Sequence, residues 1–193
     1  MHDSAKPTRE DLLRWAQKTR LGDHTAFKKL FKHFHAPLCE FVFKYVKNKQ
    51  SAEDIVQRLF LDIYEKGNNW NPRNNVKTYI YTSARNQALN YLRDNKKHIS
   101  ASAIDKTMHS ILQHSHIEEE QHARDLRQAI QKAYGEMPEQ RRLIFLLSRE
   151  SDLTYKEISS VLDISIKTVE TQMGRALKAL RKELHYFFSL VKN

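Results

Sequence analysis

The sequence has 193 residues, which is enough for one or two domains, and 29% of them are charged. Only four glycines and four prolines occur, and alternating runs of β-branched residues are nearly absent, so the composition predicts an all-α protein.

The single cysteine, Cys39, excludes a disulfide framework and a multi-cysteine zinc site, and it fits a reducing compartment. The longest apolar run, residues 143–147, is far shorter than the ~20 residues that span a bilayer, and the polar N-terminus lacks the apolar core of a secretory signal. We therefore expect a soluble cytoplasmic protein without membrane insertion.

The charge is strongly basic and unevenly distributed. Thirty-three Lys and Arg against 23 Asp and Glu give a net charge of +10, which predicts a polyanionic partner. Residues 1–97 contain 19 basic and 10 acidic groups. Residues 98–122 contain one basic and four acidic groups, and residues 123–193 contain 13 basic and nine acidic groups. Two basic blocks thus flank a slightly acidic connector. We expect two small helical domains, residues 1–97 and 123–193, joined by a flexible tether over residues 98–122.

Hydrophobic residues recur with helical spacing along both blocks. The first block predicts helices over residues 9–20, from Asp23 to about residue 46 with a kink or break at Pro37, from Ser51 (with Asp54 as cap partner) to Gly67, and over residues 76–95. The second block predicts helices over residues 123–134 and 139–150, a short helix that begins at a Thr154–Glu157 capping box, and a longer helix capped by Ser165.

The last two predicted helices suggest a DNA-binding motif. A short helix, a turn of about 3 to 4 residues and a second helix with polar and basic groups at its start is the arrangement that enters a DNA major groove. The apolar side of the second helix repeats Val169, Met173 and Ala176, which leaves Lys167 and Arg175 on the opposite side. An ordinary helical hairpin with a solvated charged face is the alternative interpretation.

The helix over residues 76–95 also has two unlike faces. Thr82, Asn86, Asn90 and Arg93 lie together at spacings of four, four and three, and Tyr81 extends the polar side. Aromatic and guanidinium planes can stack on bases, and Asn amides can bond base edges. Core aromatics beside a solvated rim explain the same pattern equally well.

The loop over residues 66–75 that precedes this helix is rich in amide groups. Such a loop could hold an unstacked base, whereas Trp70 within it suits a core anchor as well as a stacking surface.

Signals of catalysis or metal binding are missing from the sequence. It contains no Gly-rich phosphate loop, nucleophile elbow or zinc-protease motif, and Cys39 lies on an apolar helix face. Five of the ten histidines fall in the tether, but the i, i+2 pair His114 and His116 does not share a helix face and has no third ligand at suitable spacing. We therefore predict no catalytic residue, no metal and no cofactor.

Four segments together resemble the extracytoplasmic-function (ECF) family of bacterial RNA polymerase sigma factors. SAEDIVQRLFLDIYE at 51–65 looks like the family's polymerase-clamp helix, and KTYIYTSARNQALNYLRD at 77–94 looks like its promoter-melting and minus-ten helix. MPEQRRLIFLL at 137–147 and the segment 154–184 look like its helix-turn-helix domain. The resemblance implies a sigma region 2 bundle in residues 1–97 and a sigma region 4 helix-turn-helix in residues 123–193.

That resemblance implies function, partners and site residues. The chain would bind core RNA polymerase through the beta-prime clamp and beta flap, recognise the minus-ten and minus-thirty-five promoter elements and promote DNA opening; the family is commonly held inactive by an anti-sigma factor. The clamp contacts would be Asp54, Gln57, Arg58 and Phe60; the minus-ten contacts Trp70, Arg73, Asn74, Tyr81, Arg85, Asn86, Asn90 and Arg93; and the minus-thirty-five contacts Lys167, Thr168, Glu170, Thr171, Arg175 and Lys178.

Two residues depart from the family pattern. Asp163 stands in the turn where the family often has Gly, which is tolerable because Asp can adopt the left-handed conformation. Asn90 stands where many members have Asp, and an amide both donates and accepts whereas a carboxylate only accepts. The minus-ten sequence therefore does not follow from the resemblance.

Three other functions remain as alternatives. The segment ISIKTVETQM also looks like the recognition helix of response-regulator effector domains, so a stand-alone helix-turn-helix regulator that binds DNA as a dimer is the first. A metal-dependent nuclease is the second. A purely protein-binding adaptor is the third, and the two separate basic blocks disfavour it.

Overall fold

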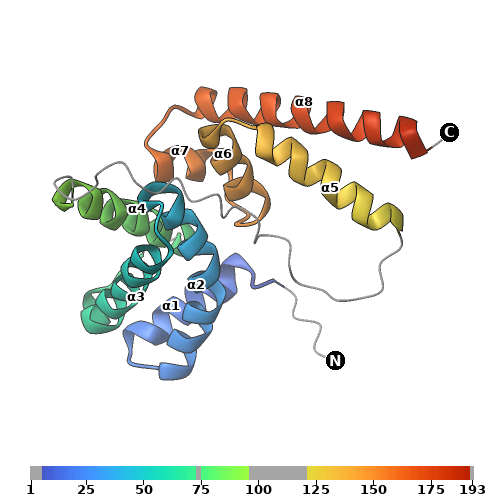
Figure 1. Cartoon of the computed structure of the whole chain (residues 1–193). Coiled ribbons are helices and arrows are strands. Elements are labelled where there is room, and N and C mark those ends of the chain that lie inside the picture. The colour runs from blue at the N-terminus through green and yellow to red at the C-terminus, as the bar shows by residue number, and fades with distance from the viewer. Residues whose placement is uncertain (1–5, 73–74, 96–120, 192–193) are drawn as a thin grey trace. The chain divides into compact units, whose positions relative to one another are not determined.

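The computed structural model describes residues 6–72, 75–95 and 121–191. Within these ranges the regular structure is entirely helical, which confirms the predicted all-α class (Figure 1). The elements are α1 (Arg9–Arg20), α2 (His24–Val46), α3 (Lys49–Lys66), the 3-10 turn η1 (Gly67–Asn69), α4 (Val76–Asp94), α5 (Gln121–Glu136), α6 (Glu139–Arg149), α7 (Tyr155–Leu162) and α8 (Ile166–Val191). No helix in the described part of the chain is both long and apolar enough to cross a membrane.

The helices divide between two compact units. The first contains α1 to α4, and the second contains α5, α6, α8 and most of α7. In the first unit α2 is central, because it packs against α1, α3 and α4. In the second, α8 packs against both α5 and α6. Each unit therefore has its own core, built around one long helix.

Apolar residues at helical spacing form the core of the first unit. Leu30, Phe34, Leu38 and Phe41 of α2 are buried on both sides of Pro37. We expected a kink or a break at Pro37; the helix runs continuously through it, so the break does not occur. Burial of α2 residues before and after the proline, in a helix that packs against α1, α3 and α4, is consistent with a tolerated loss of one backbone hydrogen bond.

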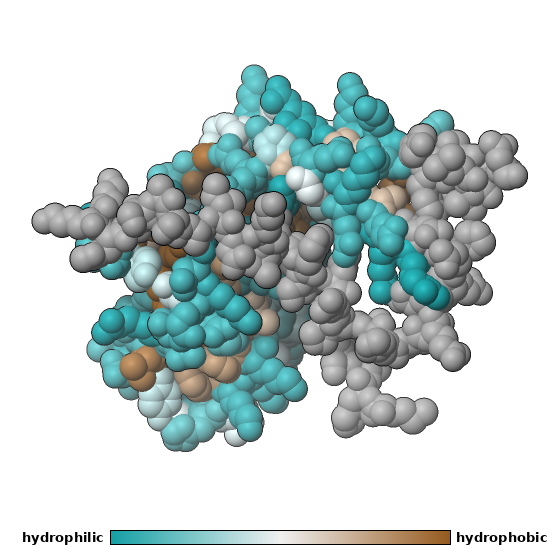
Figure 2. Space-filling model, viewed as in Figure 1, coloured by the Kyte–Doolittle hydropathy of each residue, from teal (hydrophilic) through white to brown (hydrophobic). Residues whose placement is uncertain are grey.

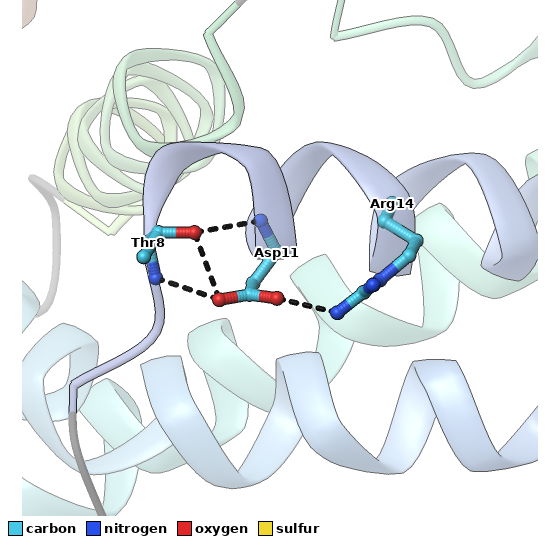
Figure 3. A network of polar contacts seen from close by, with 3 residues as sticks. All are labelled: Thr8, Asp11 and Arg14. Carbon is cyan, nitrogen blue, oxygen red and sulfur yellow. Dashed lines mark hydrogen bonds and ion pairs between the residues drawn. The ribbon is translucent and has the colours of Figure 1, made fainter.

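Side-chain caps set where the helices of the first unit begin. Thr8 and Asp11 form a reciprocal capping box at α1, and Arg14 is ion-paired with the same Asp11 carboxylate (Figure 3). Hydrogen bonds from Thr8 hold the pKa of Asp11 below its usual value. The expected cap at Ser51 is wrong, because Asn48 begins α3 and its side-chain oxygen accepts from the Ser51 backbone N–H at 2.9 Å.

Helices α7 and α8 form the predicted helix-turn-helix. Thr154 and Glu157 form the expected capping box of α7, with the Thr154 backbone N–H donating to the Glu157 carboxylate at 2.7 Å. Asp163 follows α7 with a φ of 57°, in the left-handed conformation that the sequence suggested. Ser165 then caps α8 by accepting from the Thr168 backbone N–H at 3.0 Å. Each of these three expectations is confirmed.

Candidate nucleic-acid and polymerase interfaces

One face of α3 carries exposed polar and apolar side chains. Asp54, Gln57 and Arg58, the predicted clamp contacts, are exposed. Leu61 and Tyr64 lie beside them at helical spacing and remain 53% and 42% exposed. These two were not among the clamp contacts expected from the sequence. Leu61 and Tyr64 thus add exposed apolar area to the charged face of α3.

Phe60 does not belong to this surface, which corrects the prediction. Its side chain is buried, and its ring packs edge-on against Phe27 and Phe31 of α2, with centroids 6.2 and 5.0 Å away. Phe60 therefore positions α3 on α2 and does not contribute to the exposed face of α3.

Three of the residues predicted on α4 share an exposed face. Asn86, Asn90 and Arg93 are exposed, with the exposed Leu89 between them, while Ala88 lies on the buried side. Two amides and a guanidinium in a row offer both donors and acceptors to unpaired bases.

Contacts on the inner side of α4 hold this face in place. The Gln87 side chain donates to the Asp62 carboxylate of α3 at 2.8 Å, and the hydroxyls of Ser51 and Tyr91 lie 2.8 Å apart. Arg85, predicted as a DNA contact, is half-buried and hydrogen-bonded to Tyr45. Burial raises the pKa of Tyr45, and the Arg85 charge partly opposes that shift. The exposed row is thus fixed to a rigid support.

Tyr81 is buried, so its predicted role as a direct DNA contact is wrong for this conformation. Its ring lies edge-on to Phe41 at 5.2 Å and to Phe34 at 6.5 Å. Tyr81 is therefore a core aromatic residue, which was the alternative interpretation of the pattern on this helix.

The loop between α3 and α4 is anchored at its described ends. Trp70 is fully buried, its ring lies edge-on to Tyr79 at 6.1 Å, and its backbone N–H donates to the Gly67 carbonyl at 2.9 Å. The Arg20 guanidinium of α1 donates to the Asn68 carbonyl at 3.1 Å. Trp70 is therefore a core anchor and not a base-stacking surface, which corrects the prediction. The predicted contacts Arg73 and Asn74 lie outside the described residues.

The second unit presents a row of polar side chains along the first half of α8. Val169, Met173 and Ala176 are buried on the opposite side, as predicted. The Arg141 side chain of α6 donates to the Gln172 amide oxygen at 3.1 Å and fixes the rotation of α8. The exposed members of the row are Lys167, Glu170, Thr171, Arg175 and Lys178.

Two threonines of this row also bond within the protein. The Thr168 hydroxyl is 2.8 Å from the Ser165 hydroxyl and is half-buried, so this residue belongs partly to the helix cap. The Thr171 hydroxyl donates to the Lys167 carbonyl at 2.8 Å, and its oxygen is left to accept.

The described residues can be compared with the requirements of a metal site and of a reactive thiol. Among them no three His, Cys, Asp or Glu side chains gather closely enough to hold a metal ion. Burial raises the pKa of the Cys39 thiol to about 11, so it is protonated at neutral pH and a poor nucleophile. In the space-filling view the coloured surface is mainly hydrophilic, with smaller hydrophobic patches (Figure 2). These are the features of binding surfaces.

Comparison with known proteins identifies both units. Residues 30–98 match the sigma-70 region 2 family model, and residues 127–180 match the sigma-70 region 4 model. The ECF RNA polymerase sigma factor SigW of Bacillus subtilis is 24% identical over 87% of this chain and 94% of its own length. The ECF RNA polymerase sigma-E factor of Escherichia coli is 25% identical over 85% of this chain and 89% of its own length.

Two solved structures share the fold. CnrH in complex with the cytosolic domain of CnrY aligns with a TM-score of 0.54 at 19% identity, covering 91% of this chain and 97% of CnrH. The sigma factor RpoE in complex with the anti-sigma factor NepR from Bartonella quintana aligns with a TM-score of 0.51 at 20% identity. This alignment covers 82% of this chain and 96% of the solved chain. The chain belongs to the ECF family of RNA polymerase sigma factors, which bind core polymerase and recognise promoters for transcription initiation.

Proposed function

We propose that this sigma factor divides its work between two domains, with residues 1–97 acting as region 2, residues 123–193 as region 4 and residues 98–122 as the linker. It works in the cytoplasm and has no catalytic activity of its own, because the polymerase makes the RNA. The observation that carries this proposal is that α4 and α8 each present an exposed row of amide, hydroxyl or basic groups opposite a buried apolar face.

The exposed face of α3 is the proposed contact with the beta-prime clamp. Asp54, Gln57 and Arg58 supply charge and hydrogen bonds, and Leu61 and Tyr64 supply the apolar area that becomes buried. The second unit is proposed to contact the beta flap.

The exposed row on α4 and the loop before it are the proposed minus-ten reader. Asn86, Asn90 and Arg93 face outward together and would contact unpaired bases, while Arg73 and Asn74 of the loop would help to hold a flipped base. Because binding energy is gained only once bases are unstacked, these contacts would offset the free energy of opening the duplex.

The row on α8 is the proposed minus-thirty-five reader. A helix that enters the major groove reads base edges with its first turns and holds phosphates further along. Lys167, Glu170, Thr171 and Arg175 lie in the first turns, and Lys178 follows one turn later. An anti-sigma factor that covers these surfaces is the proposed regulator, and complexes of two proteins with this fold, CnrH with CnrY and RpoE with NepR, support the suggestion.

Reconstitution with core RNA polymerase tests the function. We expect the full chain to direct transcription from discrete start sites when core enzyme is added, and to bind duplex promoter DNA only weakly by itself. Core enzyme alone is the control. Tight, dimeric binding to a palindromic duplex without polymerase, together with no directed initiation, would instead establish the stand-alone regulator.

Replacing Asn86 with alanine should impair promoter opening more than closed-complex binding. The exposed amide is expected to bond a base only after melting, so its loss should weaken the open complex by about 1–3 kcal/mol if the contact is bidentate. Permanganate footprinting measures the melted thymines, and a filter-binding assay at low temperature measures the closed complex.

Gln17→Ala is the matched control for this experiment, because it removes an exposed amide from α1. It should change neither measurement. Equal losses of opening and closed-complex binding in Asn86→Ala would show that Asn86 acts on duplex DNA.

A further inference from the structure

Gly174 lies in the interior of α8, in the middle of its exposed polar row. It stands three residues after Thr171 and four before Lys178, so all three share one side of the helix, and Gly174 is itself exposed. The proposed minus-thirty-five reader thus has a gap at its centre, with polar side chains before and after it.

Nothing within the described part of the chain explains a glycine at this position. Gly22 and Gly67 have positive φ angles of 84° and 46°, which favour glycine, but Gly174 has ordinary helical geometry. A Cβ at position 174 would meet no atom within 4 Å among the described residues. Glycine in a helix interior is destabilising relative to alanine. The free protein would therefore be more stable with alanine here.

We propose that Gly174 allows the backbone of α8 to approach duplex DNA closely in the minus-thirty-five element, and so determines how deeply the helix enters the major groove. Lys178, one turn further along, would bind a phosphate beyond this closest approach, while Thr171 and Arg175 on either side of the gap would reach base edges. A side chain at position 174 would hold the helix away from the base edges. This inference rests on the proposed role of α8 in reading promoter DNA.

The substitution Gly174→Ala tests it, because its expected effects on stability and on binding have opposite signs. Alanine should raise the Tm of the chain by a few degrees, as Gly-to-Ala changes do at compatible helix positions. It should also weaken binding of the holoenzyme to a duplex carrying the minus-thirty-five element by about tenfold, the order of effect of one methyl group too many in a packed contact. Gly174→Leu keeps a good helix former and should lower the affinity further.

Gly135→Ala is the matched control. Gly135 of α5 is also exposed and also has open space where a Cβ would lie, so alanine there should leave promoter affinity unchanged. Binding of each holoenzyme to a single-stranded minus-ten oligonucleotide should be equal, because that contact involves the other unit.

Three outcomes would overturn the inference. Unchanged duplex affinity in Gly174→Ala and Gly174→Leu would show that the gap faces solvent. A loss of core polymerase binding at unchanged DNA affinity would assign Gly174 to a protein contact. Loss in Gly135→Ala as well would indicate a general effect of helix stiffening. Failure of the wild-type holoenzyme to prefer the promoter over scrambled DNA would refute the proposed function and is distinguishable from all three.

Discussion

Trp70→Ala is expected to destabilise the N-terminal unit by about 3–5 kcal/mol, the usual range for removing a large aromatic side chain from a core. The Trp70 side chain is fully buried and packs edge-on against Tyr79, so alanine leaves a cavity between the loop and α4. Urea unfolding followed by circular dichroism measures the change in the free energy of unfolding.

Trp70→Phe is the informative companion. The indole Nε1 is buried and has no hydrogen-bond partner among the described residues, so phenylalanine removes an unsatisfied donor while keeping most of the ring contacts. We expect it to destabilise much less than alanine. A loss below about 1 kcal/mol for Trp70→Ala would show that the residue is not a core anchor, because such values are typical of surface sites, and would restore the base-stacking interpretation.

Arg175→Ala is expected to weaken recognition of the minus-thirty-five element by about 1–3 kcal/mol if its guanidinium reaches a base edge. The Arg175 side chain is exposed on the polar side of α8, one residue after Gly174, and forms no bond that competes with DNA binding in the described structure. Holoenzyme affinity for promoters with native and scrambled minus-thirty-five sequences gives the discrimination directly.

Arg181→Ala provides the contrast on the same helix. Arg181 is exposed beyond the first half of α8, where a phosphate contact is expected. Its loss should weaken binding to all sequences alike and reduce the salt dependence by the equivalent of about one phosphate. If Arg175→Ala also weakens native and scrambled sites equally, Arg175 contacts only phosphate.

Features that depend on residues three or four apart could be predicted from the sequence. The Thr154–Glu157 capping box, the Ser165 cap and the apolar side of α8 depend on spacing alone, and all are found. Ser51 was wrong because Asn48, three residues earlier, is an equally good cap, and local rules do not rank two neighbouring candidates.

The orientation of aromatic residues could not be predicted. Phe60, Trp70 and Tyr81 suit a core as well as a binding surface, and only contacts with α2 and with Tyr79 decide which way each ring points. Leu61 was missed for the converse reason, because an apolar residue on a helix suggests burial unless the neighbouring helices are known.

The hydrogen bond from Arg20 to the Asn68 carbonyl joins residues 48 positions apart. Through it, the helix at the start of the chain supports the loop that precedes α4, although α1 carries none of the proposed DNA contacts. A fragment reduced to α3, the loop and α4 would retain every one of the proposed minus-ten contacts and still lack this support. We therefore expect that a graft of the proposed minus-ten contacts onto another sigma factor would hold the loop in this conformation only if α1 were included.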